Sequence, residues 1–278
     1  MSTTAGLPLP RLSRGRFAST ASQEPLYAYT DEALFARTGV RVAFSERSGG
    51  VSTGAFGSLN LGSHVGDDLA AVEANRAALA SALGFAGAPV VVPKQVHGDR
   101  LVAIDGTRTV EEVRADVAQG ADGLIVRTPG VAGLLCYADC TPVIVVAPTG
   151  AAAVVHAGWR GVAAHIAVSA LSALCADGAA RPGDCNVYIG PYIHAECFEV
   201  SAELRDAFAR DFGEDCAPDA RHVDMGACLR RDLGEAGVAP ERIADVDVCT
   251  VCTTERFYSY RASSGTCGRH GAFAALSR

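Results

Sequence analysis

The spacing of apolar positions divides the chain into alternating predicted strands and helices. Residues 40–47 alternate apolar and polar side chains, as a strand does, and the pattern breaks at Gly49 and Gly50. Residues 69–83 repeat apolar side chains at helical spacing and stop at Gly84, a common C-terminal cap. Three continuous apolar runs, typical of strands covered on both faces, span residues 131–138, 142–147 and 151–156.

The remaining patterns complete an interleaved series. Further strands are predicted at 88–96, 101–104, 186–189, 243–250 and 272–276, and further helices at 161–175, 202–212 and 225–236. Strands that cluster in the middle of the chain favour a mixed sheet over regular parallel repetition. The sequence therefore predicts the α/β class.

Chain length and composition define the expected domain. The chain has 278 residues, enough for a large core in one domain or in two closely packed halves. The first acidic residue is Glu24, and arginine, serine and threonine precede it. We expect residues 1–24 to form a disordered tail, although a transit peptide has a similar composition, and residues 25–278 to form a single catalytic domain.

Charge, hydropathy and cysteine content limit the partners. The formal net charge is −7 without a basic stripe, so no nucleic-acid partner is expected. Neither a run of about 18 apolar residues nor a secretory signal is present, so no membrane association is expected. Ten cysteines without such a signal indicate a reducing, cytoplasmic compartment, in which they serve as thiols or ligands.

Polar, ligand-capable residues gather in four segments at predicted strand ends, where α/β enzymes place their sites. The segments are KQVHG at 94–98, ADCTP at 138–142, HAGWRG at 156–161, and FYSYR at 257–261 followed by Gly268 and Arg269. The first three each contribute one metal-ligand residue: His97, Cys140 and His156. Two imidazoles and a thiolate suit zinc and leave a fourth position for water or substrate. Spacing alone does not show convergence, and buried core residues are the alternative.

Two other interpretations of these segments stay open. Cys140 and His156 form a nucleophile and its base in a cysteine hydrolase, with Asp139 orienting the pair, but His97 then has no role. The turn at Gly158 leads into a predicted helix, whose free N–H groups favour an anion. Arg160, and Arg47 much nearer the N-terminus, can add guanidinium groups to this anion site, unless they lie in solvent.

A second set of cysteine and histidine residues could also bind a metal and is considered separately. Cys249-x2-Cys252 followed by Cys267-x2-His270 imitates the spacing of a zinc ribbon. The residues between the two pairs include Phe257, Tyr258 and Tyr260, which favour a strand or pocket over a free knuckle. We therefore do not expect a ribbon.

The motifs, in this order, resemble the YfiH-type laccase-domain family, also called the multicopper polyphenol oxidase family. The resemblance runs from about Arg41 to the C-terminus. It is carried by RSGGVS (47–52), LNLG (59–62), VGDD (65–68), QVHG (95–98), ADC (138–140), HAGWRG (156–161), IGP (189–191), CFEV (197–200) and FYSYR (257–261).

The resemblance implies both an activity and a site. Its members are purine nucleoside phosphorylases with adenosine deaminase activity, which implies adenosine, inosine or methylthioadenosine plus phosphate as substrates. It implies zinc, or copper in the older description, held by His97, Cys140 and His156, in a compact, mixed-sheet α/β/α domain related to cysteine deamidases. Asp139 is expected beside the metal as a supporting or acid–base residue. Expected substrate or phosphate contacts are Arg47, Gln95, Arg160, Arg261 and Arg269.

Two positions depart from the family pattern, and three rival functions remain. Thr266-Cys267-Gly268-Arg269 inserts one residue into a Thr-Gly-Arg motif, and Glu46 replaces the usual Thr or Ser before Arg47. The rivals are a copper oxidase acting on phenols, a Cys140–His156 hydrolase editing cell-wall peptide precursors, and a non-enzymatic sensor bound to cell-division proteins. Seven scattered histidines argue against several coppers.

Overall fold

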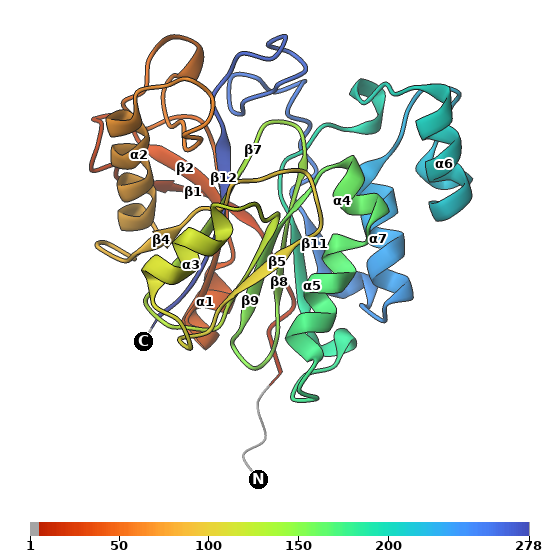
Figure 1. Ribbon diagram of the computed structural model, residues 1–278, viewed down its shortest axis with the longest axis horizontal. Coiled ribbons are helices and arrows are strands. Elements are labelled where there is room, and N and C mark those ends of the chain that lie inside the picture. The colour runs from red at the N-terminus through yellow and green to blue at the C-terminus, as the bar shows by residue number, and fades with distance from the viewer. Residues whose placement is uncertain (1–5, 278) are drawn as a thin grey trace.

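The computed structural model describes residues 6–277, which contain two six-stranded mixed sheets (Figure 1). The first sheet has the order β1-β2-β3-β12-β7-β4. Its strands are β1 (Ser13–Phe17), β2 (Leu26–Thr30), β3 (Val40–Ser45), β12 (His270–Leu276), β7 (Ala132–Tyr137) and β4 (Val90–Val91). Only β4 and β7 pair in parallel within it; the other neighbours are antiparallel.

The second sheet has the order β11-β10-β8-β9-β6-β5. Its strands are β11 (Ile243–Asp245), β10 (Asn186–Ile189), β8 (Thr141–Val146), β9 (Ala152–Ala157), β6 (Gly123–Val126) and β5 (Leu101–Ile104). The outer pairs β10–β11 and β5–β6 are parallel, and the central pairs are antiparallel. The mixed character expected from the clustered apolar runs is confirmed, with the strands divided between two sheets.

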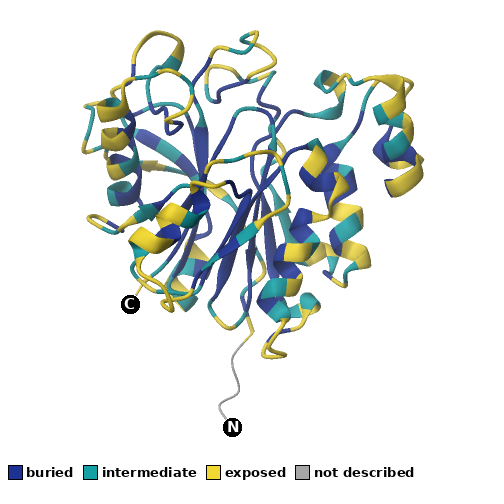
Figure 2. Cartoon of the chain, viewed as in Figure 1, coloured by how far each residue is buried: buried dark blue, intermediate teal, exposed yellow. Residues whose placement is uncertain are grey.

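The sheets face each other across a shared core. Side chains of the first sheet such as Val42 and Leu135 pack with Leu124 and Val154 of the second. The buried strands occupy the middle of the molecule, with helices on both sides (Figure 2). The apolar runs at β7, β8 and β9 are buried along their whole length, which explains why they lack polar alternation.

Helices cover the two outer faces of this sandwich (Figure 1). Residues of α2 (Leu69–Ala82) pack on the first sheet. Residues of α5 (Ile166–Cys175), α6 (Ala202–Phe212) and α7 (Met225–Glu235) pack with the second sheet. The short helices α1 (Glu32–Thr38) and α3 (Val110–Val117) bury side chains in the core between the sheets.

Helix periodicity predicted one element that the structure divides. The segment 161–175 covers the end of α4 (Trp159–Ala163) and all of α5, which Ala164 and His165 separate. His165 has a left-handed φ of 55°, which interrupts the α-helical path between the two helices. A strand predicted at 88–96 is reduced to the two residues of β4, so His97 lies in a loop beyond it.

The prediction of a disordered tail is wrong for the described residues of that segment, while residues 1–5 lie outside the described part. Residues 13–17 form β1, and Leu7 is buried. Two contacts order the segment: β1 pairs antiparallel with β2, and Arg14 donates to the buried carboxylate of Glu46 at 2.6 Å. Burial alone would raise the pKa of Glu46, but Arg14 and Arg256 lower it. Residues 13–17 are therefore an edge strand of the first sheet, held by backbone pairing and by this ion pair.

Within residues 6–277, no helix is long and apolar enough to cross a membrane.

Candidate metal centre and substrate cavity

Three side chains from separate elements converge where strands of both sheets end. His97 lies in the loop after β4, Cys140 in the connection between β7 and β8, and His156 near the end of β9. Their ligand atoms all lie within 4.8 Å of one another. We call these residues the triad. Two imidazoles and one thiol at this separation can hold a metal ion.

Asp122 positions both histidines and was not identified from the sequence. Its Oδ1 lies 2.9 Å from His156 Nδ1 and accepts the His97 amide at 2.9 Å. Its Oδ2 accepts the Gly98 amide at 2.7 Å. Because Nδ1 is occupied, His156 presents Nε2 to a metal, in the carboxylate–histidine arrangement common beside metal ions.

Asp122 is fully buried at the start of β6. Burial raises its pKa, but hydrogen bonds from His156 and from the Gly98 amide outweigh that effect and lower it. The sequence around it, Ala121-Asp122-Gly123, gives no signal beyond an acidic residue that enters an apolar strand. Only the pairing of β6 with β9 brings it beneath His156.

Cys140 and His156 stabilise each other's charged forms. Burial opposes ionisation of Cys140, but the neighbouring His156 and His97 lower the pKa of the thiol to about 6. Burial also opposes the charge on His156, whereas Cys140 and Asp122 raise the pKa of that imidazole to about 9. The triad therefore favours a thiolate at neutral pH, which is the form that binds metals.

Gly158 leaves room above the triad. A Cβ atom placed there would lie 3.2 Å from Cys140 Sγ and 3.3 Å from His97 Cδ2. Its φ of −68° and ψ of 168° are accessible to any residue, so space and not backbone conformation favours glycine here.

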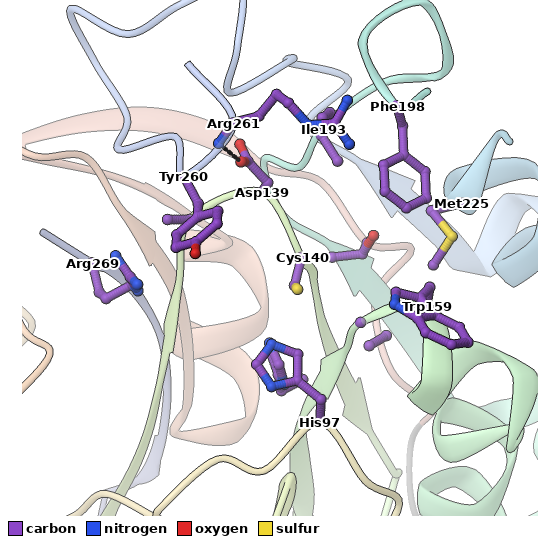
Figure 3. A pocket seen from close by; sticks show the side chains of 15 residues that line it. His97, Asp139, Cys140, Trp159, Ile193, Phe198, Met225, Tyr260, Arg261 and Arg269 are labelled. Atoms are coloured by element: carbon purple, nitrogen blue, oxygen red, sulfur yellow. Dashed lines mark hydrogen bonds between the residues drawn. The ribbon is translucent and has the colours of Figure 1, made fainter. Parts of the chain in front are cut away.

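The triad lies at a cavity of about 430 Å³, a size that suits a small organic ligand. One side of this cavity is apolar and is formed by Trp159, Ile193, Phe198 and Met225. Tyr260 and Arg269 lie on the opposite side, with Cys140 and His97 between the two sides (Figure 3). The cavity thus offers an apolar surface and a guanidinium to one ligand.

Asp139 and Arg261 both line the cavity and are hydrogen-bonded to each other. Asp139 has a φ of 95° and accepts the Thr250 hydroxyl at 2.7 Å and the Arg261 amide at 2.7 Å (Figure 3). The Arg261 guanidinium donates to the carbonyls of Cys197 and Glu199. Asp139 therefore holds the C-terminal loop beside the triad.

Three residues predicted to contact substrate do not line this cavity. Arg47 donates to the carbonyls of Gly57 and Thr254 and stacks on Tyr258. Gln95 bonds the backbone of Cys136 through both ends of its amide. Arg160 stacks on the ring of Trp159. Of the five expected contacts, the structure brings Arg261 and Arg269 to the cavity.

The zinc-ribbon spacing does not become a ribbon, as expected. His270 is buried among aromatic rings, 5.3 Å from Phe257 and 6.5 Å from Tyr258 between ring centroids. Cys267 contacts the Arg269 guanidinium. Both residues are thus occupied away from Cys249 and Cys252.

Residues 41–277 match the family described as multi-copper polyphenol oxidoreductase laccase. A purine nucleoside phosphorylase of Mycobacterium tuberculosis is 38% identical over 250 residues, which cover 85% of this chain and 91% of that protein. The adenosine deaminase RL5, from an unknown prokaryotic organism, is 32% identical over 238 residues, covering 82% of this chain and 90% of that one.

The fold is shared with a solved relative. The crystal structure of YlmD from Geobacillus stearothermophilus matches with a TM-score of 0.78 and 33% identity, over 86% of this chain and 93% of that one. The family match covers all three triad positions and the strands that carry them. This chain therefore belongs to the multi-copper polyphenol oxidoreductase laccase family, the YfiH-type proteins that its sequence motifs resemble.

Proposed function

We propose that this protein is a purine nucleoside phosphorylase that cleaves adenosine, inosine or methylthioadenosine with phosphate. A phosphate oxygen forms a bond to the anomeric carbon, the bond from that carbon to the base nitrogen breaks, and the base takes up a proton. The relative from M. tuberculosis that carries this name supports the activity class. One observation supports it most: the triad lies between an apolar surface and a guanidinium in one cavity.

The two sides of the cavity suit the two parts of a nucleoside phosphorolysis complex. A purine ring would lie against Phe198, Met225 and Trp159, where apolar contact compensates for lost hydration. Arg269 and Arg261 border the cavity and would attract phosphate, whereas Arg47 and Arg160 are not among the residues that line it. Positioning the two reactants and compensating charge would provide most of the rate acceleration.

We propose zinc as the metal. Its preferred ligands match two imidazoles and one thiolate, and three protein ligands leave one position for substrate or water. When bound, zinc would polarise a substrate oxygen or activate water, and the latter chemistry accounts for a deaminase activity. Asp122 holds His156 in the required tautomer, and Asp139 holds the wall of the cavity in place.

Adenosine deamination is a second activity of the same cavity in this proposal. The relative named adenosine deaminase RL5 supports it. A multicopper mechanism lacks comparable support. Among residues 6–277, two groups of side chains can hold a metal, and the triad is the one that contains histidine.

The thiolate character of Cys140 also suits a metal-free cysteine hydrolase. The two mechanisms differ in their need for metal. A hydrolase would be inactivated by iodoacetamide and unaffected by zinc removal, whereas bound zinc would protect Cys140 from alkylation and be needed for turnover.

The test is chromatography of zinc-loaded protein incubated with adenosine, with and without phosphate. We expect adenine that depends on phosphate, together with ribose 1-phosphate, and its loss in His97→Ala and Cys140→Ala. Inosine formed without phosphate would establish the deaminase activity. Turnover of no nucleoside by correctly folded, zinc-loaded protein would overturn the proposal.

A further inference from the structure

A second group of metal-binding side chains lies outside the triad. The group consists of Glu196, Cys197, Cys249 and Cys252, whose ligand atoms all lie within 4.8 Å of one another. We call it the thiolate cluster. Its members come from two segments that the sequence separates by about fifty residues: the turn Ala195–Cys197 and the turn that follows Cys249.

Backbone pairing fixes the two segments against each other. Tyr192 and Cys249 form a parallel bridge, and the Thr250 amide donates to the Tyr192 carbonyl at 3.0 Å. The thiols meet as a result: Cys197 Sγ lies 3.6 Å from Cys252 Sγ. Tetrahedral zinc with bonds of about 2.3 Å separates its sulfur ligands by roughly 3.8 Å, so this pair already has the required spacing.

A backbone amide is directed at one sulfur atom of the cluster. The backbone N–H of His194 donates to Cys249 Sγ at 3.4 Å, an arrangement that stabilises thiolate ligands of metal centres. Glu196 adds a carboxylate as the fourth donor. Nε2 of His194 is buried with no hydrogen-bond partner among the described residues.

We propose that the thiolate cluster is a structural zinc site, closed by four protein ligands and distinct from the triad. Three thiolates and one carboxylate fill a tetrahedral coordination sphere and leave no position for substrate. Zinc is favoured over harder cations because thiolate sulfur is a soft ligand.

The thiolate cluster lies next to residues that form one wall of the cavity. Ile193 and Phe198, on either side of the first turn, line the apolar side of the cavity. Arg261 lies downstream of the second turn and bonds the Cys197 carbonyl. Zinc in the cluster would hold this wall to the C-terminal loop without taking part in the reaction.

The first experiment counts zinc atoms per chain by mass spectrometry, in protein purified under reducing conditions without chelator. We expect Cys197→Ser/Cys252→Ser to contain one zinc fewer than wild type. Cys175→Ser is the matched control, because Cys175 and Cys185 form a thiol pair 3.8 Å apart that has no further ligand group among residues 6–277. The control should keep the wild-type content, and equal zinc in the double variant and wild type would overturn the proposal.

A second experiment leaves the cluster intact and so does not depend on how its variants fold. Cys140→Ala removes the one thiolate of the triad. Cobalt(II) added to this variant should still give the near-ultraviolet absorption of thiolate-to-cobalt charge transfer, with the intensity of several thiolates. Absence of that absorption, or a Cys197–Cys252 disulfide seen as a mass 2 Da lower in freshly reduced and purified protein, would overturn the proposal.

Discussion

The triad combines two side chains from loops with one from the buried strand β9, whereas the thiolate cluster takes its side chains from two turns. Asp122 is fully buried and bonds both the ring of His156 and the amide of His97. In the thiolate cluster, Cys252 and Glu196 are exposed, and Cys249 Sγ accepts a hydrogen bond from the His194 amide. The triad rests on a buried carboxylate and opens into a cavity, and the thiolate cluster is peripheral.

The number of donors separates the two sites chemically. Three donors beside a cavity leave one coordination position for a reactant, while four donors close the sphere. In the two proposals, one metal would serve the reaction and the other would hold the cavity wall. On this distinction, loss of a triad ligand should lower activity strongly, and loss of a ligand of the thiolate cluster should not.

The largest difference in activity is expected between a variant that lacks the triad thiolate and a variant that lacks one thiolate of the cluster. Cys140→Ala should lower kcat/KM for adenosine by more than about a hundredfold, since even loss of an outer partner of a metal ligand costs 10–100-fold. Cys252→Ser should leave kcat within about threefold, because no reacting group is removed. Steady-state assays with phosphate measure both, and equal losses would contradict the separation of roles.

Asp122→Asn tests whether the Asp122 carboxylate holds His97 and His156 in position for a metal ion. The substitution keeps the shape but removes the charge that stabilises His156, so zinc affinity and activity should fall by about 10–100-fold. Competition with a chromogenic chelator measures the affinity. Asp116→Asn, at a partly exposed carboxylate paired with Arg100 and Arg108, is the control and should change neither quantity. An equal loss in both variants would contradict the role of Asp122.

His270 offers a test of the core beneath the triad. Its ring lies between Tyr137 and Tyr258, and Tyr137 contacts His156. Burial, with Arg269 beside it, lowers the pKa of His270 to about 3. The unfolded chain therefore binds a proton below pH 6.5 that the folded protein does not, so stability is complete above pH 6.5 and falls as the pH falls toward 3.

For this one histidine, linkage predicts a loss of about 2 kcal/mol in the free energy of unfolding between pH 8 and pH 5. His270→Phe keeps an aromatic ring and removes the titrating group, so its loss should be smaller by that amount. Urea unfolding at the two pH values measures the difference. The same loss in both proteins would show that His270 does not contribute to acid sensitivity.

The smallest effect is expected from Gly158→Ala. The added methyl group would press on Cys140 and His97 by a few tenths of an ångström, so we expect activity to fall by about threefold to tenfold. Gly234→Ala in α7 is the control, because a Cβ there meets no atom within 4 Å. Cobalt spectra of the thiolate cluster should be unchanged in both variants. Full activity in Gly158→Ala would show that the triad tolerates contact from above.

Local patterns predicted much of the scaffold. The boundaries of β5, β10 and α6 agree with the periodicity because each element lies between clear breaks and has one consistent environment. Short elements such as α1 and α3 were not predicted, since seven or eight residues contain too little periodicity. The assignment of residues 13–17 to a tail failed because the strand is held by pairing with β2 and by an ion pair with Glu46, and the composition of the segment shows neither contact.

The site was predictable only in part, for a related reason. The residue types of the triad are informative in themselves, and the structure brings the three together. Asp122 carries no local signal, since its role arises from strand pairing. Cys197 lies far from Cys249 in sequence, so spacing first associated Cys249 and Cys252 with Cys267 and His270, which are nearer along the chain but not in space.

The central position of β12 has a consequence for biosynthesis. This strand, near the C-terminal end of the described chain, lies between β3 and β7, which are translated much earlier (Figure 1). Until residues 270–276 leave the ribosome, both earlier strands expose an unpaired edge to other nascent chains. Folding of the first sheet must therefore be largely post-translational, and truncated translation products that lack β12 should aggregate.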